Sequence, residues 1–265
     1  MNKRILLVVG DKFASYVAHK EAVTVSELLA LLSMSKTRSN TSDRTVLVPG
    51  QGIGDESRQA LLRAAASSQN VSDFDFSLWH NLPERASPIH SHKTNSRNVL
   101  VSVPRQVASD VFELDVMIDE DCELMTDHMS GQHMQGMVLM EAARQAMIVV
   151  IETHLMPDYD IDYSFIADSL SVNYSNYGFP VTAITRITFT KIETDDAKLL
   201  KFASTADVMQ CGHSVAEFTM ALSAVEKNRM SKQERILGVK THRQFLASVA
   251  GNLSNQSGLV GGASR

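Results

Sequence analysis

Three polar side chains interrupt an otherwise apolar stretch at the spacing of one helical face. Glu141, Arg144 and Gln145 stand at positions i, i+3 and i+4, and the other residues from 137 to 151 are Met, Val, Leu, Ile and Ala. A helix this apolar must be covered on most sides, so its polar face is predicted to lie in a cleft or at a subunit seam. Burial raises the pKa of a carboxyl group and a guanidinium lowers it, and this balance suits acid–base chemistry. The alternative is a structural ion pair.

Two histidines precede this helix. His128 and His133 lie in a polar loop, and Gly136 allows the backbone to turn tightly into the helix. Backbone N–H groups near Gly136, at the positive helix end, are candidate oxyanion donors. The histidines lack the spacing of a zinc motif and have no cysteine near them in sequence. The sequence therefore predicts no metal site.

The elements that position this helix follow an α+β pattern. Residues 81–92 form a predicted linker, and residues 93–227 contain two alternating, strand-like stretches at 98–107 and 111–118, the long helix at about 136–155 and four further strand-like runs. An antiparallel sheet wrapped around the helix would cover it. Residues 228–265 form a basic tail, predicted to hold a short helix at 240–249 and to be partly disordered at its end.

Residues 1–80 read as a separate small α/β unit. Apolar runs at 5–9, 45–48 and 74–79 alternate with helical patterns at 25–32 and 55–66, which predicts a three-stranded, half Rossmann-like parallel sheet. Three glycines follow the second run, at positions 50, 52 and 54. They indicate a structural turn, with a phosphate cradle as the alternative.

Composition limits the function classes. The 265 residues are 44% hydrophobic and 21% charged, as in ordinary globular proteins. A net charge of −5 argues against a uniformly basic nucleic-acid binder. Two cysteines cannot form a disulfide framework at this length and fit a reducing compartment. No apolar run is long enough for a signal peptide or a membrane span, so a cytoplasmic protein is expected, without nucleic-acid or membrane partners.

Residues 132–145 read Gln-His-Met-Gln-Gly-Met-Val-Leu-Met-Glu-Ala-Ala-Arg-Gln. This segment resembles the helix motif of the A-factor biosynthesis (AfsA-like) hotdog proteins, roughly D-H-x-P-G-M-x-x-x-E-A-x-R-Q. Upstream, Ile-His-Ser-His-Lys at 89–93 resembles that family's H-K/R signature, and the resemblance covers about residues 86–226. His128 followed by Gly136 and Glu141 is more distantly similar to hotdog acyl-carrier-protein dehydratases, in which the His and Glu are catalytic. The resemblance implies a hotdog fold.

The resemblance also implies a reaction. It is the transfer of a β-ketoacyl group from a carrier-protein or CoA thioester to a hydroxyl of a small phosphorylated acceptor, in signal or secondary-metabolite biosynthesis. The phosphopantetheine thioester is then a substrate, and no tightly bound cofactor is expected. Glu141 is the candidate base, Arg144 would orient it or meet an anionic acceptor, and His128 or His133 would complete proton transfer. The residues expected to bind substrate are Gln145, Gly136, Met137, His92 and Lys93.

Two other functions remain open from the sequence. One is a hydroxyacyl-thioester dehydratase or thioesterase. The other is a non-catalytic acyl-ligand binding or partner protein, because Gln132 and Gln135 stand where the motif has Asp and Pro. A single hotdog repeat per chain, in a family with shared sites, predicts a homodimer.

Overall fold

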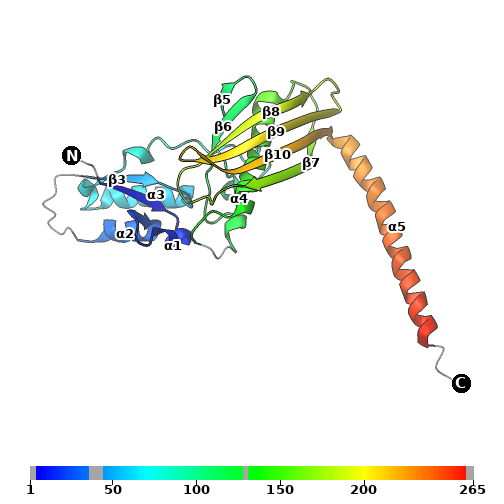
Figure 1. Ribbon diagram of the computed structural model, residues 1–265, viewed down its shortest axis with the longest axis horizontal. Coiled ribbons are helices and arrows are strands. Elements are labelled where there is room, and N and C mark those ends of the chain that lie inside the picture. The colour runs from blue at the N-terminus through cyan, green and yellow to red at the C-terminus, as the bar shows by residue number, and fades with distance from the viewer. Residues whose placement is uncertain (1–3, 36–43, 128–130, 261–265) are drawn as a thin grey trace.

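The computed structural model describes residues 4–35, 44–127 and 131–260. A small α/β unit, a larger sheet around a helix, and a long C-terminal helix follow one another along the molecule (Figure 1). Apolar side chains form two clusters, one within the α/β unit and one between the larger sheet and its helix. Val9 and Phe13 of the α/β unit belong to the second cluster, so the two parts share packing at their junction.

The α/β unit has a parallel sheet of four strands in the order β2-β1-β3-β4. The strands are β1 (Ile5–Val9), β2 (Ala22–Thr24), β3 (Thr45–Pro49) and β4 (Phe74–Asp75). The prediction of three strands missed β2, because three residues at a sheet edge are too few to give a pattern. The predicted third strand is also shorter than expected, since residues 77–79 form a 3₁₀ turn, η3 (Ser77–Trp79).

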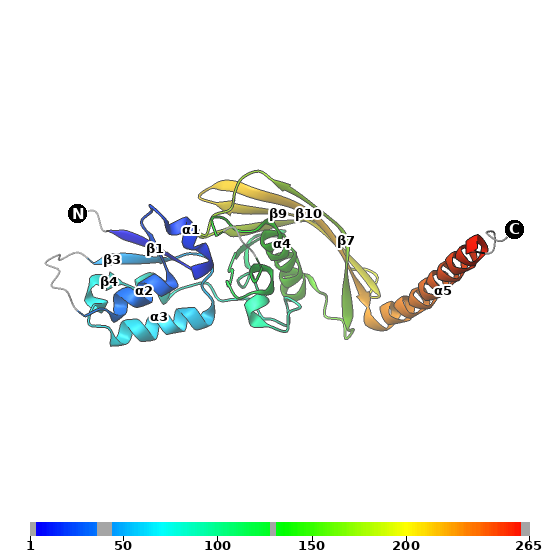
Figure 2. The same cartoon turned by 90° about the horizontal axis from the view of Figure 1, so that it is seen from below.

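Helices α2 (Val25–Ser33) and α3 (Asp55–Ser67) lie on one face of this sheet (Figure 2). Thr24 begins α2 with a capping box, in which its hydroxyl accepts from the Glu27 N–H and the Glu27 carboxylate accepts from the Thr24 N–H. Helix α3 begins at Asp55, as the predicted pattern at 55–66 indicated, and Gly54 is its N-cap. The short helix α1 (Ala14–Val17) connects β1 to β2.

The larger sheet has six strands in the order β5-β6-β8-β9-β10-β7, and every neighbouring pair is antiparallel. Figure 2 shows α4 (Gly136–Val150) lying inside the curve of this sheet. The predicted hotdog arrangement is therefore confirmed. The strands are β5 (Arg105–Ala108), β6 (Val111–Asp115), β7 (Tyr163–Tyr174), β8 (Ile184–Glu193), β9 (Leu199–Gln210) and β10 (His213–Glu226).

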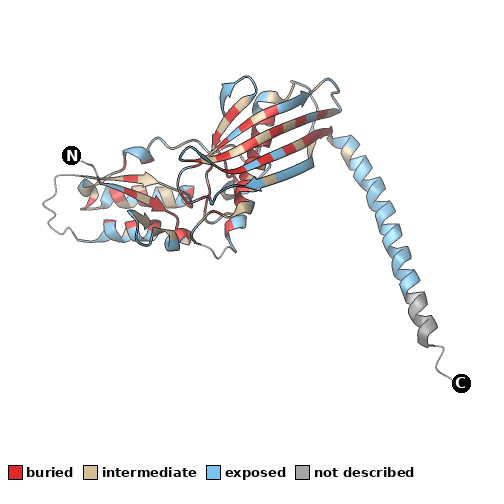
Figure 3. Ribbon diagram, viewed as in Figure 1, coloured by how far each residue is buried: buried red, intermediate tan, exposed pale blue. Residues whose placement is uncertain are grey.

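Burial explains the composition of α4. Ten of its residues are buried, among them Val138, Leu139 and Ile148, and the strands that face it alternate buried and more exposed residues (Figure 3). Each large apolar side chain buried in this way contributes about 1.5–3 kcal/mol. The helix continues into one π-helical segment, η6 (Ile151–Leu155), and ends before Pro157. The apolar sides of this helix are thus covered by the sheet together with preceding segments, from which Leu100 and Met125 join the same core, as its sequence requires.

The first strand of the larger sheet begins later than predicted. Residues 98–107 were expected to form it, but β5 starts at Arg105 and residues 96–98 form a 3₁₀ turn, η4 (Ser96–Asn98). The Leu100 N–H donates to the amide oxygen of Gln145 at 2.8 Å. The following residues pair through isolated bridges, Val101 with Val116 and Ser102 with Arg85, and not as a continuous strand.

The C-terminal helix α5 (Lys227–Val260) differs from the tail that was predicted. The chain is helical without a break from Lys227, whereas a short helix at 240–249 and a partly disordered end were expected. Its described side chains are almost all exposed, and Figure 3 shows it extending away from the sheet. In the parts of the chain that the structure describes, no helix is both long and apolar enough to cross a membrane.

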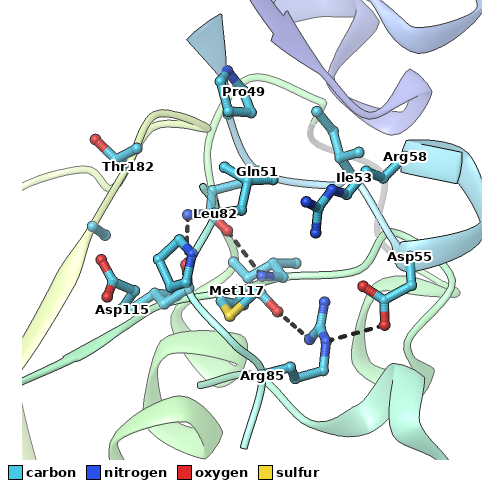
Figure 4. A pocket seen from close by; sticks show the side chains of 15 residues that line it. Pro49, Gln51, Ile53, Asp55, Arg58, Leu82, Arg85, Asp115, Met117 and Thr182 are labelled. Carbon is cyan, nitrogen blue, oxygen red and sulfur yellow. Dashed lines mark hydrogen bonds and ion pairs between the residues drawn. The ribbon is translucent and has the colours of Figure 1, made fainter. Parts of the chain in front are cut away.

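The junction between the two parts encloses a small cavity of about 90 Å³ (Figure 4). Gln51 lies beside it, and its amide donates to the Val116 carbonyl at 2.9 Å and accepts from the Ile118 N–H at 2.8 Å. Arg85, from the predicted linker, donates to the Met117 carbonyl at 2.8 Å and approaches Asp55 of α3 at 3.8 Å. Gln51 of the α/β unit and Arg85 of the linker therefore hold the two parts together.

Candidate active site on the polar face of the central helix

Glu141 is the centre of the polar cluster on α4. Arg144 binds its carboxylate with two hydrogen bonds of 2.7 Å, one to each oxygen. Gln145 donates to Oε1 at 2.9 Å, and the Lys93 ammonium lies 2.7 Å from the same oxygen. The predicted helical face thus forms, and the loop carrying Lys93 closes it from the far side.

These partners control the charge of Glu141. Burial raises its pKa, but the hydrogen bonds from Arg144, Gln145 and Lys93 outweigh burial and lower the pKa to about 2. Glu141 is therefore an anion at neutral pH, with two cations beside it. A carboxylate held in this way is a weak base. Its pKa rises only when the neighbouring cations bind another anion in its place.

A cavity of about 220 Å³ opens beside this cluster. Its charged side consists of Lys93, Glu141 and Arg144. The rest of its lining is mostly apolar: Leu100, Cys122, Leu124, Met137, Met140 and Leu170, with Asn98 and Glu123 at its polar margin. A carboxylate–cation cluster next to an apolar recess can hold a molecule with a charged or polar end and an alkyl end.

His92 reaches a second carboxylate on the same side of the helix. Its Nε2 lies 3.0 Å from Glu152 of η6, and its ring packs edge-on against Phe165 at 4.8 Å. His90 lies 3.9 Å from Glu152. The loop with the His-Lys signature therefore spans two acidic side chains of the helix, with Lys93 on Glu141 and His92 on Glu152.

The structure separates His133 from this cluster. His133 lines another cavity, of about 510 Å³, together with Gly136, Tyr174 and Tyr177, and its ring lies 5.3 Å from that of Tyr177. Met137 lines the Glu141 cavity instead. The first turn of α4 therefore lies between two cavities. His128, the other predicted proton-transfer group, falls outside the described residues.

Gln145 has a different position from the substrate contact that was expected. Its side chain is fully buried, and its amide joins the Leu100 N–H, the Asn98 carbonyl and Glu141. It lies behind Glu141 and fixes the carboxylate to the loop that precedes β5. Gln145 is thus a positioning group for the candidate catalytic residue.

Some residues of the site carried no signal in the sequence. Leu170 lies on β7 and Cys122 to Leu124 lie in an acidic stretch before α4, and all of them line the Glu141 cavity. Their types are common in any core or loop, so only the packing identifies them. Among the described residues, no group of three or more His, Cys, Asp or Glu side chains is arranged to hold a metal ion.

The chain is similar to known hotdog proteins. Among the solved structures that align with it are a mutant thioesterase from Pseudomonas aeruginosa (12% identity, 57% of this chain and 99% of that one, TM-score 0.39), a thioesterase from Haemophilus influenzae (11%, 52% and 88%, 0.37), and a Bacillus halodurans protein solved with CoA (14%, 47% and 74%, 0.36). No curated protein matches the chain at a significant level. A model of the A-factor biosynthesis hotdog domain matches residues 77–226, more than half of the chain. The chain therefore belongs to the family of the A-factor biosynthesis hotdog domain.

Proposed function

We propose that this protein is an acyltransferase that moves a β-ketoacyl group from a carrier-protein or CoA thioester to a hydroxyl of a small phosphorylated acceptor. The observation that carries the proposal is the Glu141–Arg144–Lys93 cluster at the side of an apolar cavity. Membership of the A-factor biosynthesis family supports the same reaction class.

The lining of the cavity suits the two substrates. Met137, Met140 and Leu170 offer flexible or branched apolar surface for an acyl chain. Arg144 and Lys93 are the cations for a phosphoryl group on the acceptor, because a guanidinium and an ammonium both bind phosphate oxygens.

Acceptor binding would also activate Glu141. When the phosphoryl group draws Arg144 and Lys93 towards itself, the carboxylate loses the contacts that lower its pKa and becomes a stronger base. It then takes the proton of the acceptor hydroxyl as the hydroxyl oxygen attacks the thioester carbonyl carbon. The carbon–sulfur bond breaks, the proton passes to the leaving thiolate, and an ester and a thiol result.

The oxyanion formed during this attack needs donors. The backbone N–H groups of Gly136 and Met137 stand at the positive end of α4, between the two cavities, and we assign them this role. His133 lies in the cavity on the Gly136 side, so any part it has in proton transfer requires a substrate that reaches both cavities.

The decisive experiment identifies products. We expect mass spectrometry to find a β-ketoacyl ester when the protein is incubated with β-ketoacyl thioesters of carrier protein or CoA and a phosphorylated hydroxy acceptor such as dihydroxyacetone phosphate. Free acid without ester would make the protein a thioesterase, and an unsaturated product formed from a hydroxyacyl thioester would make it a dehydratase. Bound but unchanged thioester would identify a binding protein. Each of these three outcomes would contradict acyl transfer.

A second prediction concerns the subunit seam. Strand β7 is at the edge of the sheet, with Leu170 41% exposed and Tyr174 45% exposed, and Leu170 also lines the Glu141 cavity. We expect a homodimer that pairs β7 with its copy and completes the cavity. Light scattering should give twice the chain mass of 29.2 kDa, and Leu170→Asp should shift the protein towards the monomer.

A matched control is available on α5. Leu237 is 51% exposed and lies on α5, which extends away from the sheet (Figure 3), so Leu237→Asp should leave the dimer intact. A wild-type protein of monomer mass would contradict the predicted seam.

A further inference from the structure

The α/β unit has a crevice that the rest of the chain fills. The carboxyl ends of β1 and β3 meet where the strand order changes direction, the place where open α/β sheets bind ligands. Gly52, with a φ of 86°, donates its N–H to the Ile118 carbonyl at 3.0 Å. A Cβ atom on Gly54 would collide with the carboxylate of Asp119. The glycine-rich turn therefore admits a segment of the hotdog domain at very close range.

Lys12 also binds this segment of the hotdog domain, through three hydrogen bonds. Its backbone N–H donates to the Glu120 carboxylate at 2.8 Å. Its ammonium donates to the Glu120 carbonyl at 2.5 Å and to the Met125 carbonyl at 3.2 Å. These three bonds join the loop after β1 to residues more than 100 positions away in the sequence. Burial raises the pKa of Glu120, which is consistent with a carboxylate enclosed at this junction.

The fastened segment also borders the candidate active site. Residues 118–125, which we call the wall segment, include Cys122, Glu123 and Leu124 of the Glu141 cavity. Lys12 bonds to the wall segment on both sides of Cys122, at Glu120 and at Met125. The family match begins at residue 77, so the α/β unit with Lys12 lies outside it.

We propose that the α/β unit positions the wall segment, and that Lys12 is the positioning residue through which it shapes the acyl-binding side of the Glu141 cavity. This inference rests on the proposed function for its effect on catalysis, but not for its effect on the wall segment itself. Glu141 is held by Lys93, Arg144 and Gln145, which belong to the hotdog part of the chain. Loss of the Lys12 bonds should therefore weaken thioester binding and spare the carboxylate.

Cys122 reports on the wall segment without any need for activity. It is buried, whereas Cys211 is exposed, so Cys211→Ser leaves a protein whose thiol reactivity under native conditions measures opening around Cys122. We expect Lys12→Met in this background to speed the modification of Cys122 by a maleimide about tenfold, because charge-assisted bonds to the wall segment are lost. Lys12→Arg, which keeps donors at this position, should restore much of the protection.

Hydrogen exchange and kinetics distinguish a positioning role of Lys12 from a general effect on the stability of the protein. With Lys12→Met, amide exchange should rise in residues 118–125 and stay slow in α4, and KM for the thioester should rise about tenfold while kcat changes little. Lys201→Met, an exposed lysine of β9, is the matched control and should change none of these values.

Three results would overturn the proposal. They are an unchanged Cys122 rate with Lys12→Met, faster exchange in α4 to the same extent as in the wall segment, and an unchanged KM despite a more reactive Cys122. Failure of the proposed function would look different. The wild-type chain would then turn over no thioester, and the Cys122 and exchange results would still decide whether Lys12 holds the wall segment.

Discussion

Replacing Glu141 with Gln should lower the rate of acyl transfer by about 10²–10⁴-fold, the range expected when a general base is lost. The amide has nearly the shape of the carboxylate but cannot take a proton from the acceptor hydroxyl. It also loses the charge that now attracts Arg144 and Lys93. The rate of ester formation from thioester and acceptor, followed by mass spectrometry, measures the effect.

The fold should survive this change. Arg144 is partly exposed and can turn to water, so circular dichroism and thermal unfolding should show a native protein that still binds the acyl thioester. Glu217→Gln, on an exposed position of β10, is the matched control and should keep full activity. A Glu141→Gln protein with wild-type activity would remove Glu141 from the mechanism.

Replacing Gln145 with Leu should have the largest effect on stability, about 2–4 kcal/mol. Leucine is similar in size, but it offers no partner to the Leu100 N–H or the Asn98 carbonyl, both bound by the Gln145 amide. Buried backbone groups without hydrogen bonds carry the full cost of their desolvation. Thermal unfolding should shift down by about 5–15 °C for a chain of this size.

An exposed glutamine supplies the comparison. Gln233 lies on α5, and Gln233→Leu should change the free energy of unfolding by less than about 0.5 kcal/mol. If Gln145→Leu were equally mild, the amide bridge between α4 and the loop before β5 would have no structural importance. A stable Gln145→Leu protein that lost activity would assign Gln145 to catalysis alone.

Periodicity predicted those parts of the fold that depend on local burial. The apolar run of α4 indicated a covered helix, and the alternating runs after it indicated the strands that cover it, because each element must bury one face. Periodicity did not predict an element that is very short, or a segment whose hydrogen-bond partner is remote in the sequence. Strand β2 has three residues, and the chain near Leu100 forms isolated β-bridges while the Leu100 N–H donates to the side chain of Gln145.

The same division holds for the candidate site. The spacing of Glu141, Arg144 and Gln145 placed them on one helical face, because helix geometry depends on sequence separation alone. Sequence spacing could not separate His133, which has a cavity of its own, from the Glu141 cluster. It also could not show that Gln145 is buried behind the carboxylate, since burial depends on what packs over the helix.

The sequence by itself determined the central helix, its polar face and the family to which the motif belongs. Those properties follow from residue type and spacing within one segment. Only the tertiary structure decided that Lys93 and Arg144 together keep Glu141 charged, and that Leu170 lines the cavity beside it. Only the tertiary structure joined Lys12 to the wall segment as well. These contacts link residues from separate elements. Their distances depend on how the sheet, the helix and the α/β unit pack together, and a local sequence pattern does not predict that packing.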